Sequence, residues 1–168
     1  MPYWKKLTTT GALGKTPSQV YNFIKSIIPI RTNFVVEAGA GRGELSQLFP
    51  ICNQLYLFEP DSVSAMHLSI QLPHATIHQS SIYDFEHSIW RTSGWDLFIC
   101  SIPLSFYPKS NTVDLMNKVK ERLNPGGEVI IVFTAFWMIR PLLQMFPNSD
   151  CRPFLVFPPY FVLHYRKT

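Results

Sequence analysis

The chain has 168 residues, of which 46% are hydrophobic, and it carries a formal net charge of +4. A chain of this length favours one domain with one sizeable core, so we expect residues 1–168 to form a single domain whose first 16 residues are a flexible basic segment. The longest uncharged apolar stretch, Val129 to Ile139, has 11 residues. It is too short for a membrane-spanning helix of about 20 residues, and no secretory signal peptide is visible.

The cysteines and histidines indicate no metal site. Cys52, Cys100 and Cys151 lie far apart without a C-x-x-C spacing, which predicts reduced thiols in a cytoplasmic protein. His74 and His78 are four residues apart, but the preceding proline and a strand-like pattern argue against the helix that would bring them together on one metal ion.

Acidic and basic residues are segregated along the chain. All 11 acids lie between residues 37 and 150, whereas residues 1–36 contain five bases and residues 151–168 contain three. Two acid-free ends favour a polyanionic partner, either an anionic membrane surface or nucleic acid. The alternative is a solvated surface with an accidental bias.

The first predicted helix runs from Thr16 to before Pro29, with Thr16 as the N-cap and Pro17 in the first turn. Apolar residues recur there at helical spacing. They are Val20, Phe23, Ile24, Ile27 and Ile28. We interpret this helix as one that packs on a sheet.

A strand predicted over residues 33–38 ends in the loop Glu37-Ala38-Gly39-Ala40-Gly41-Arg42-Gly43-Glu44. Glycine permits a positive φ and leaves no Cβ between the backbone and a ligand, so we expect a ligand close to this loop. The spacing fails the dinucleotide pattern G-x-G-x-x-G, because position 44 is Glu where that pattern has Gly. A pyrophosphate is therefore disfavoured. A short helix is expected over residues 44–49.

A second apolar strand, residues 55–59, ends in Glu59, 22 residues after Glu37. An acid at this offset from a glycine loop is placed to accept hydrogen bonds from the hydroxyls of a nucleoside ribose. Asp61 is expected to cap a helix that extends to about Gln71. Its partial core is predicted to consist of Val63, Met66, Leu68 and Ile70.

The remaining elements complete an alternating pattern. Strands are expected over residues 75–79, 96–101 and 128–133, a helix over 111–123, and a hairpin with a proline turn over 152–166. The fourth strand ends in Ser101-Ile102-Pro103, and a proline at a strand's carboxyl end opens the chain where α/β sheets hold ligands. The sequence predicts an α/β fold: a Rossmann-like, doubly wound, mostly parallel sheet with a C-terminal antiparallel hairpin.

Four features stand in the order seen in class I methyltransferases that use S-adenosylmethionine (SAM): the glycine loop, the acid after the second strand, the proline turn after the fourth and Pro-Gly-Gly before the fifth. Within that class the chain resembles the bacterial phospholipid N-methyltransferases and, next, the ribosomal RNA adenine dimethyltransferases. Three stretches carry the resemblance, which covers nearly the whole chain from Gly11. They are Gly11-Ala12-Leu13-Gly14-Lys15-Thr16-Pro17-Ser18, Ser101-Ile102-Pro103-Leu104-Ser105-Phe106, and the run from Val156-Phe157-Pro158-Pro159-Tyr160 to Tyr165-Arg166-Lys167.

The resemblance implies roles for individual residues. Glu37 and the glycines would hold the methionine part of SAM, Glu59 its ribose, and the turn at Ser81 its adenine. The implied cofactor-binding residues are Glu37, Gly39, Ala40, Gly41, Gly43, Glu59, Pro60, Ser81, Ile82 and Ser101. The candidate catalytic residues are Ser101, Pro103 and Tyr160, and the candidate substrate or membrane contacts are Lys5, Lys6, Gly11, Lys15, Phe106 and Arg166.

The chain departs from the family at two places. An acid is usual where Ser81 stands, and a serine hydroxyl replaces only part of its contact with the adenine amino group. The segment before Gly11 is shorter than the membrane-contacting helix of the relatives. These departures leave a methyltransferase-like binding module without catalysis as one alternative.

The acceptor is interpreted from the turn after the fourth strand. Base methyltransferases grip an exocyclic amine with an Asn or Asp before the proline and stack the base on an aromatic ring after it. This chain has Ser101 and Leu104 at those positions, which favours a phospholipid amine such as phosphatidylethanolamine and a peripheral location at the inner face of the membrane. A nucleic acid or a soluble small molecule is the alternative acceptor. Tyr160, His164 and Tyr165 are candidates for taking up a proton, and the sequence does not choose among them.

Overall fold

A computed structural model describes residues 15–29, 32–49, 52–84 and 86–168 of the chain. Its centre is one seven-stranded sheet with the order β3-β2-β1-β4-β5-β7-β6. The strands are β1 (Phe34–Ala38), β2 (Gln54–Phe58), β3 (Thr76–His78), β4 (Trp95–Cys100), β5 (Leu123–Phe133), β6 (Asp150–Phe154) and β7 (Tyr160–Arg166). Strands β1 to β5 are parallel, whereas β7 runs antiparallel to both β5 and β6.

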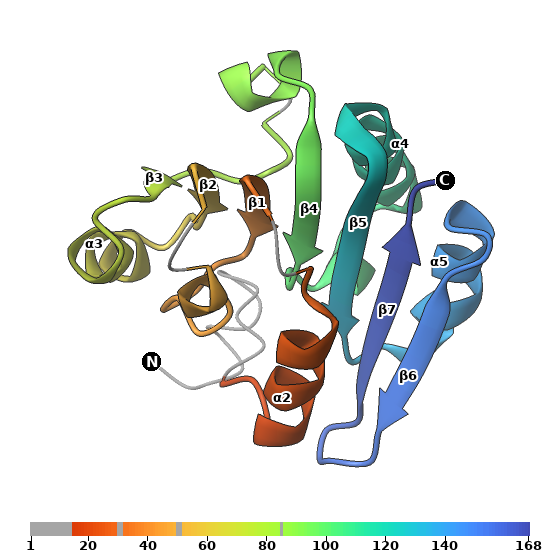
Figure 1. The fold of residues 1–168 in the computed structure, drawn as a ribbon. Helices are drawn as coiled ribbons and strands as arrows, with labels where there is room; N and C mark the ends of the chain where they lie inside the picture. Colours follow the sequence, from red (N-terminus) through yellow and green to blue (C-terminus); the bar gives the residue numbers. More distant parts are fainter. Residues whose placement is uncertain (1–14, 30–31, 50–51, 85) are drawn as a thin grey trace.

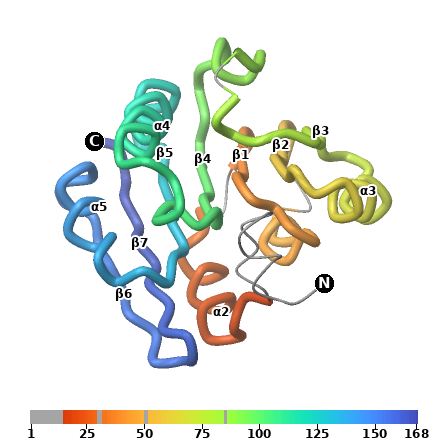
Figure 2. The backbone as a smooth tube through the Cα atoms, turned by 180° about the vertical axis from the view of Figure 1, so that it is seen from behind, coloured from red at the N-terminus to blue at the C-terminus, as the bar shows by residue number. Residues whose placement is uncertain are grey.

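Helices cover both faces of the sheet (Figures 1 and 2). The α-helices are α2 (Ser18–Ile27), α3 (Ser62–Gln71), α4 (Lys109–Arg122) and α5 (Ile139–Met145), and the 3₁₀ turns are η1 (Ser46–Leu48), η2 (Ser88–Arg91), η3 (Leu104–Phe106) and η4 (Phe136–Met138). Alternate residues of β1 enter different cores, because successive strand side chains point to opposite faces. Val35 packs with α2 and α3, and Val36 packs with α4 and α5.

The sheet reverses its winding at β1, which pairs with β2 on one side and β4 on the other. Chain connections therefore leave the carboxyl ends of β1 and β4 in opposite directions. A crevice at such a reversal is where open α/β sheets hold ligands. In Figure 1 these carboxyl ends point downward, toward α2 and the β6–β7 turn.

The predicted fold class is confirmed, including the C-terminal hairpin. Local predictions are wrong at three places. Pro17, rather than Thr16, is the N-cap of α2. Only the 3₁₀ turn η1 forms where a short helix was expected. Helix α5 was not predicted; its Pro141 lies in the first turn, where the missing N–H has no intrahelical partner to lose.

The orientation of α3 also differs from the prediction. Asp61 is its N-cap and accepts a hydrogen bond from the Ser64 N–H, as expected. Of the four apolar residues assigned to its core, only Leu68 is buried. The other three, Val63, Met66 and Ile70, are 61%, 62% and 74% exposed. A different face of the helix is buried against the protein, and Ala65 is its second buried residue.

Two further properties concern the chain as a whole. No helix in the described part of the chain is long and apolar enough to cross a bilayer. The three cysteines are free thiols, and Cys100 is buried in the core.

Candidate functional site: a cavity at the carboxyl ends of the parallel strands

A cavity of about 480 Å³ lies at the reversal point of the sheet, within the roughly 300–1,000 Å³ range of small-molecule sites. Its wall comes from the glycine loop after β1, the ends of β2 and β4, the turn after β3, and the adjoining ends of β5 and β7. Nine of the ten predicted cofactor-binding residues line it. They are Glu37, Gly39, Ala40, Gly41, Glu59, Pro60, Ser81, Ile82 and Ser101.

The three loop glycines have positive φ angles of 81°, 55° and 83°, but they serve different purposes. A Cβ on Gly39 would lie 2.8 Å from Ile102 Cγ2, and a Cβ on Gly43 would lie 2.9 Å from Leu68 Cδ2. Those two glycines allow close packing. A Cβ on Gly41 would meet nothing within 4 Å, so Gly41 alone keeps open space in the cavity. Gly43 is the one predicted cofactor-binding residue outside the lining.

The Glu59 carboxylate is held from two sides by the backbone. Gly41 N–H donates to Oε2 at 2.8 Å and Asp61 N–H donates to Oε1 at 2.9 Å. A carboxylate has about four acceptor sites, so each oxygen keeps capacity for a ligand hydroxyl. Burial raises the pKa of Glu59, and the two backbone hydrogen bonds oppose that rise.

Glu37 is the most deeply buried acid of the site, at 1% exposure. Ser46 Oγ donates to its Oε2 at 2.6 Å. Burial raises the pKa of Glu37 to about 7; the Ser46 hydrogen bond lowers it and the neighbouring Glu59 adds to the rise. Near neutral pH this carboxyl therefore changes charge readily, and a cation in the cavity favours its ionised form.

The turn after β3 forms a third wall, made of Ser80, Ser81 and Ile82. Ser81 Oγ accepts from the Tyr83 N–H at 3.2 Å, which leaves its hydroxyl proton and one lone pair for a ligand. Ser80 Oγ is buried and has no hydrogen-bond partner among the described residues. Sequence reasoning singled out Ser81 and Ile82 but not Ser80, because a buried, unsatisfied hydroxyl cannot be recognised without the surrounding geometry.

The opposite wall is built from the ends of β4, β5 and β7. Ser101 Oγ donates to the Gly39 carbonyl oxygen at 2.8 Å, which fastens the end of β4 to the glycine loop. Its proton is therefore engaged and its oxygen is left as an acceptor. Ile102, Tyr107, Val132 and Tyr160 complete this apolar and aromatic side of the cavity.

The predicted catalytic and substrate-contacting residues lie in different places. Pro103 is buried beside the cavity without lining it, and Phe106 is 62% exposed. Arg166, at the end of β7, pairs with Glu128 in the middle of β5, and its Nε is 3.9 Å from Glu128 Oε1. Lys15 lines the cavity, whereas Lys5, Lys6 and Gly11 fall outside the described residues.

The three candidate proton acceptors lie in different parts of the molecule. His164 Nε2 lies 2.7 Å from Glu128 Oε2 across β5 and β7, away from the cavity. Tyr160 lines the cavity, and Tyr165 packs on Phe146. Of the three, the structure therefore places only Tyr160 at the site.

Sequence reasoning missed residues that reach the cavity from distant segments. Tyr107 lies beyond the proline turn and packs on Tyr83, with ring centroids 4.4 Å apart. Thr16 and Glu44 form another part of the wall, because Thr16 N–H donates to Glu44 Oε2 at 2.7 Å. Their 28-residue separation carries no local pattern that would have indicated the contact.

Comparisons with known proteins support the fold assignment. No family model and no curated protein sequence matches the chain. Solved structures do match, although at low identity. The precorrin-6Y C5,15-methyltransferase of Geobacter metallireducens is 11% identical with a TM-score of 0.72, covering 95% of this chain and 94% of that one. An rRNA methylase of Streptococcus thermophilus is 14% identical with a TM-score of 0.66, covering 94% and 100%.

A third similar structure contains a ligand. The N-methyltransferase NodS of Bradyrhizobium japonicum, solved with S-adenosylhomocysteine, is 12% identical with a TM-score of 0.64, and the match covers 81% of this chain and 78% of that chain. These matches span most of both chains, and identities of this size establish a shared fold. The chain thus has the Rossmann-like fold of class I SAM-dependent methyltransferases.

Proposed function

We propose that this protein is a SAM-dependent methyltransferase that transfers methyl groups to the amine of a phospholipid headgroup of the phosphatidylethanolamine type. The observation that carries the cofactor assignment is the open space above Gly41, bounded by Glu59 and Glu37 in one cavity. The acceptor assignment is supported by the turn after β4, where Ser101 and Leu104 stand at the positions of a base-gripping amide and a stacking ring.

The residues present fit SAM in size, charge and hydrogen bonding. Glu37 lies in the cavity as a buried acid that a cationic ligand would hold ionised, which suits the ammonium group of the methionine part. Glu59 retains acceptor capacity for the ribose hydroxyls. Ser81 can still both donate and accept one hydrogen bond, and Ile82 supplies an apolar surface for the adenine.

When bound, SAM supplies a methyl group activated on a sulfonium. The protein's main task in such a displacement is to align donor and acceptor, since positioning alone supplies much of the rate. Ser101 fixes the end of β4 on the Gly39 carbonyl, so its oxygen is held where it can accept a hydrogen bond from an amine. Tyr160 borders the same space and is the side chain best placed to relay the amine's proton to solvent.

The turn after β4 favours a lipid amine over a nucleic acid base. Leu104, at the position where base methyltransferases place a stacking ring, is 1% exposed and belongs to the core. Ser101 offers a hydroxyl in place of a base-gripping amide. A flexible headgroup amine needs neither a stacking ring nor an amide, whereas an extruded base depends on such contacts.

Two alternatives remain. A methyltransferase acting on nucleic acid or a soluble small molecule is favoured by the basic ends of the chain, which would bind phosphate. A methyltransferase-like binding module without catalysis is favoured by Ser81 in place of an acid.

Parallel transfer assays discriminate among these functions. The protein is incubated with SAM carrying a radiolabelled methyl group and with vesicles of phosphatidylethanolamine and phosphatidylglycerol, with RNA, or with a cell extract depleted of lipid. We expect label in the lipid extract. Label only in RNA or only in soluble compounds would identify that fraction as the acceptor and reject the phospholipid. SAM binding without transfer to any fraction would support the binding module.

A further inference from the structure

The turn between β6 and β7, residues 155–159, presents an unusual amount of apolar surface to solvent. Leu155 is 96% exposed and Phe157 is 101% exposed, whereas Val156 between them packs on the core. The two exposed side chains therefore project into solvent from the same turn. All five residues of the turn are uncharged, and Pro158 and Pro159 restrict its backbone. We call residues 155–159 the hairpin tip.

The hairpin tip protrudes beside the cavity. In Figures 1 and 2 it is the lowest part of the molecule, next to α2. Tyr160, which lines the cavity, follows Pro159 directly. Three residues span at most about 10 Å, so Phe157 lies within that reach of the cavity wall. A surface that received the tip would thus come close to the acceptor side of the cavity.

A second exposed apolar pair follows β5. Phe136 and Trp137 are 67% and 61% exposed, with ring centroids 5.4 Å apart. They come four and five residues after Val132, another residue of the cavity wall. Single exposed hydrophobic residues are ordinary, but large apolar side chains grouped on loops around one opening mark an interaction surface.

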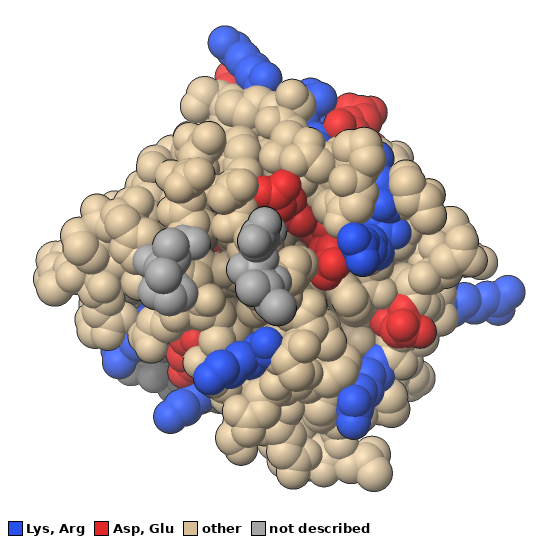
Figure 3. All heavy atoms as spheres, viewed as in Figure 1, with Lys and Arg blue, Asp and Glu red and all other residues tan. Residues whose placement is uncertain are grey.

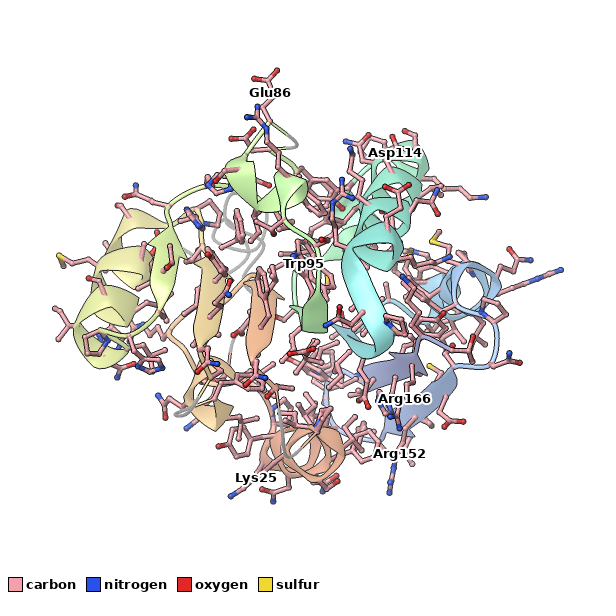
Figure 4. All side chains as sticks on the ribbon, turned by 45° about the horizontal axis from the view of Figure 1, so that its top comes forward. Lys25, Glu86, Trp95, Asp114, Arg152 and Arg166 are labelled. Carbon is pink, nitrogen blue, oxygen red and sulfur yellow. The ribbon has the colours of Figure 1, made fainter. Side chains whose placement is uncertain are left out.

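The charges around the hairpin tip are basic. Arg152, at the base of the tip, lies over the Phe23 ring of α2 at 4.7 Å and is itself exposed. Lys25 projects from the last turn of α2, and Figure 4 shows both side chains at the same edge of the molecule. Neither α2 nor residues 151–168 contain an acid. In Figure 3 the lowest surface is free of charged side chains, with basic ones above it.

We infer that the hairpin tip inserts into an anionic phospholipid bilayer, with Leu155 and Phe157 below the headgroups and Arg152 and Lys25 at the phosphate level. The inference rests on the proposed function, since a headgroup acceptor requires the cavity to meet a membrane. Apolar side chains at a protruding point with cations behind them suit an interface whose inner part is apolar and whose surface is negative. A small protruding tip offers little area for self-association, which takes about 800 Å² per partner.

The test compares two matched double variants of the full chain. The first is Leu155→Ser with Phe157→Ser. The control is Met66→Ser with Ile70→Ser, on α3, which removes two other exposed apolar side chains and changes no charge. Binding to vesicles of phosphatidylglycerol and phosphatidylethanolamine is measured by flotation at low and high salt, and SAM affinity is measured by calorimetry.

We expect the tip variant to lose vesicle partitioning by about tenfold or more, and the control to stay within about twofold of the parent. SAM affinity should be equal in all three, which shows that the cavity is intact. Equal flotation of tip variant and parent, or no flotation of the parent, would overturn the inference. So would a parent that sediments as a dimer while the tip variant sediments as a monomer, because the tip would then be a contact between copies.

The two proposals fail in different ways. Loss of SAM binding in the parent contradicts the proposed function and leaves flotation unaffected. Methyl transfer to lipid that persists equally in the tip variant contradicts insertion of the tip and leaves the enzymatic function intact.

Discussion

The backbone N–H of Gly41 donates a hydrogen bond of 2.8 Å to the carboxylate of Glu59, so the glycine loop and the end of β2 form one unit. The same carboxylate also accepts from Asp61 N–H, at the start of α3. One side chain thus sets the position of two cavity walls and offers its remaining lone pairs to a ligand. Loop geometry and ligand binding should therefore change together when Glu59 is altered.

Replacing Glu59 by Ala should weaken SAM binding by about 1 to 3 kcal/mol, because ligand hydroxyls lose a charged acceptor and the loop loses its anchor. Calorimetry gives the affinity, and thermal unfolding without ligand reports the loss of the anchor. Glu44→Ala is a matched control that removes another carboxylate of the cavity wall, one that holds Thr16 instead. Unchanged affinity in a folded Glu59→Ala protein would place Glu59 outside the ligand site.

The buried Glu37 carboxyl should make stability depend on pH. Its pKa is raised from 4.5 to about 7 in the folded protein. Its contribution to the free energy of unfolding is therefore fully present below about pH 4.5 and is lost as pH rises through 7. Glu37→Gln should remove that loss, which is on the order of 3 kcal/mol for a shift of this size. The check is chemical denaturation of parent and variant between pH 5 and about 8. Equal pH profiles would contradict the raised pKa.

The same carboxyl should couple SAM binding to proton release. A cationic ligand favours ionised Glu37, so affinity should rise with pH up to about 7 and level off above. Calorimetry at pH 6 in two buffers of different ionisation enthalpy measures the protons released. The Glu37→Gln protein should release fewer protons when SAM binds. Equal proton release by the parent and the variant would show that another group loses the proton.

The contact between Gly39 and Ile102 predicts a non-additive pair of substitutions. Gly39→Ala should destabilise the protein by about 1 to 3 kcal/mol, since the new Cβ meets Ile102 Cγ2 at 2.8 Å. Adding Ile102→Ala should recover part of that loss, because it removes the methyl group in conflict. Part should remain, since φ at Gly39 is +81°. A double-mutant cycle with no coupling would show that the two residues do not compete for space.

The acid-free ends of the chain predict a salt-dependent association with anionic membranes. Each basic residue near such a surface contributes about 1 kcal/mol, screened within a Debye length of about 8 Å at physiological salt. Replacing Lys5 and Lys6 by Gln should reduce both vesicle binding and lipid methylation while sparing SAM affinity; Lys15 is left in place because it lines the cavity. RNA contacts would be salt-dependent too, so a protein that shifts RNA and leaves anionic vesicles unbound would contradict the phospholipid acceptor.

Much of the fold follows from local patterns, and most of the cavity follows from strand ends. Glu37, Glu59 and Ser101 each end or follow an apolar strand, and the carboxyl ends of parallel strands meet at one edge. Sequence could therefore group them before any geometry was known. It could not separate the roles of Gly39 and Gly41, since identical glycines differ only in what a Cβ would meet.

The remaining errors have a common cause. The core of helix α3 was predicted as Val63, Met66, Leu68 and Ile70 from their hydrophobicity, yet its buried residues are Ala65 and Leu68. Leu68 belongs to the core cluster on one face of the sheet, and that tertiary packing fixes which side of the helix is buried. Tyr107 and Thr16 reach the cavity through tertiary contacts that have no local spacing. The sequence predicts an apolar hairpin here, but it does not show that the side chains of Leu155 and Phe157 are exposed.

Calorimetric titration of SAM into the parent, Gly41→Val and Gly126→Val tests the central claim most directly. Both glycines have positive φ, so both substitutions strain the backbone. A side chain at 41 enters open cavity space, whereas one at 126 lies near Arg166, away from the cavity. We predict binding by the parent and by Gly126→Val and none by folded Gly41→Val. Equal affinity in all three proteins, or no binding by the parent, would contradict a SAM site above the glycine loop.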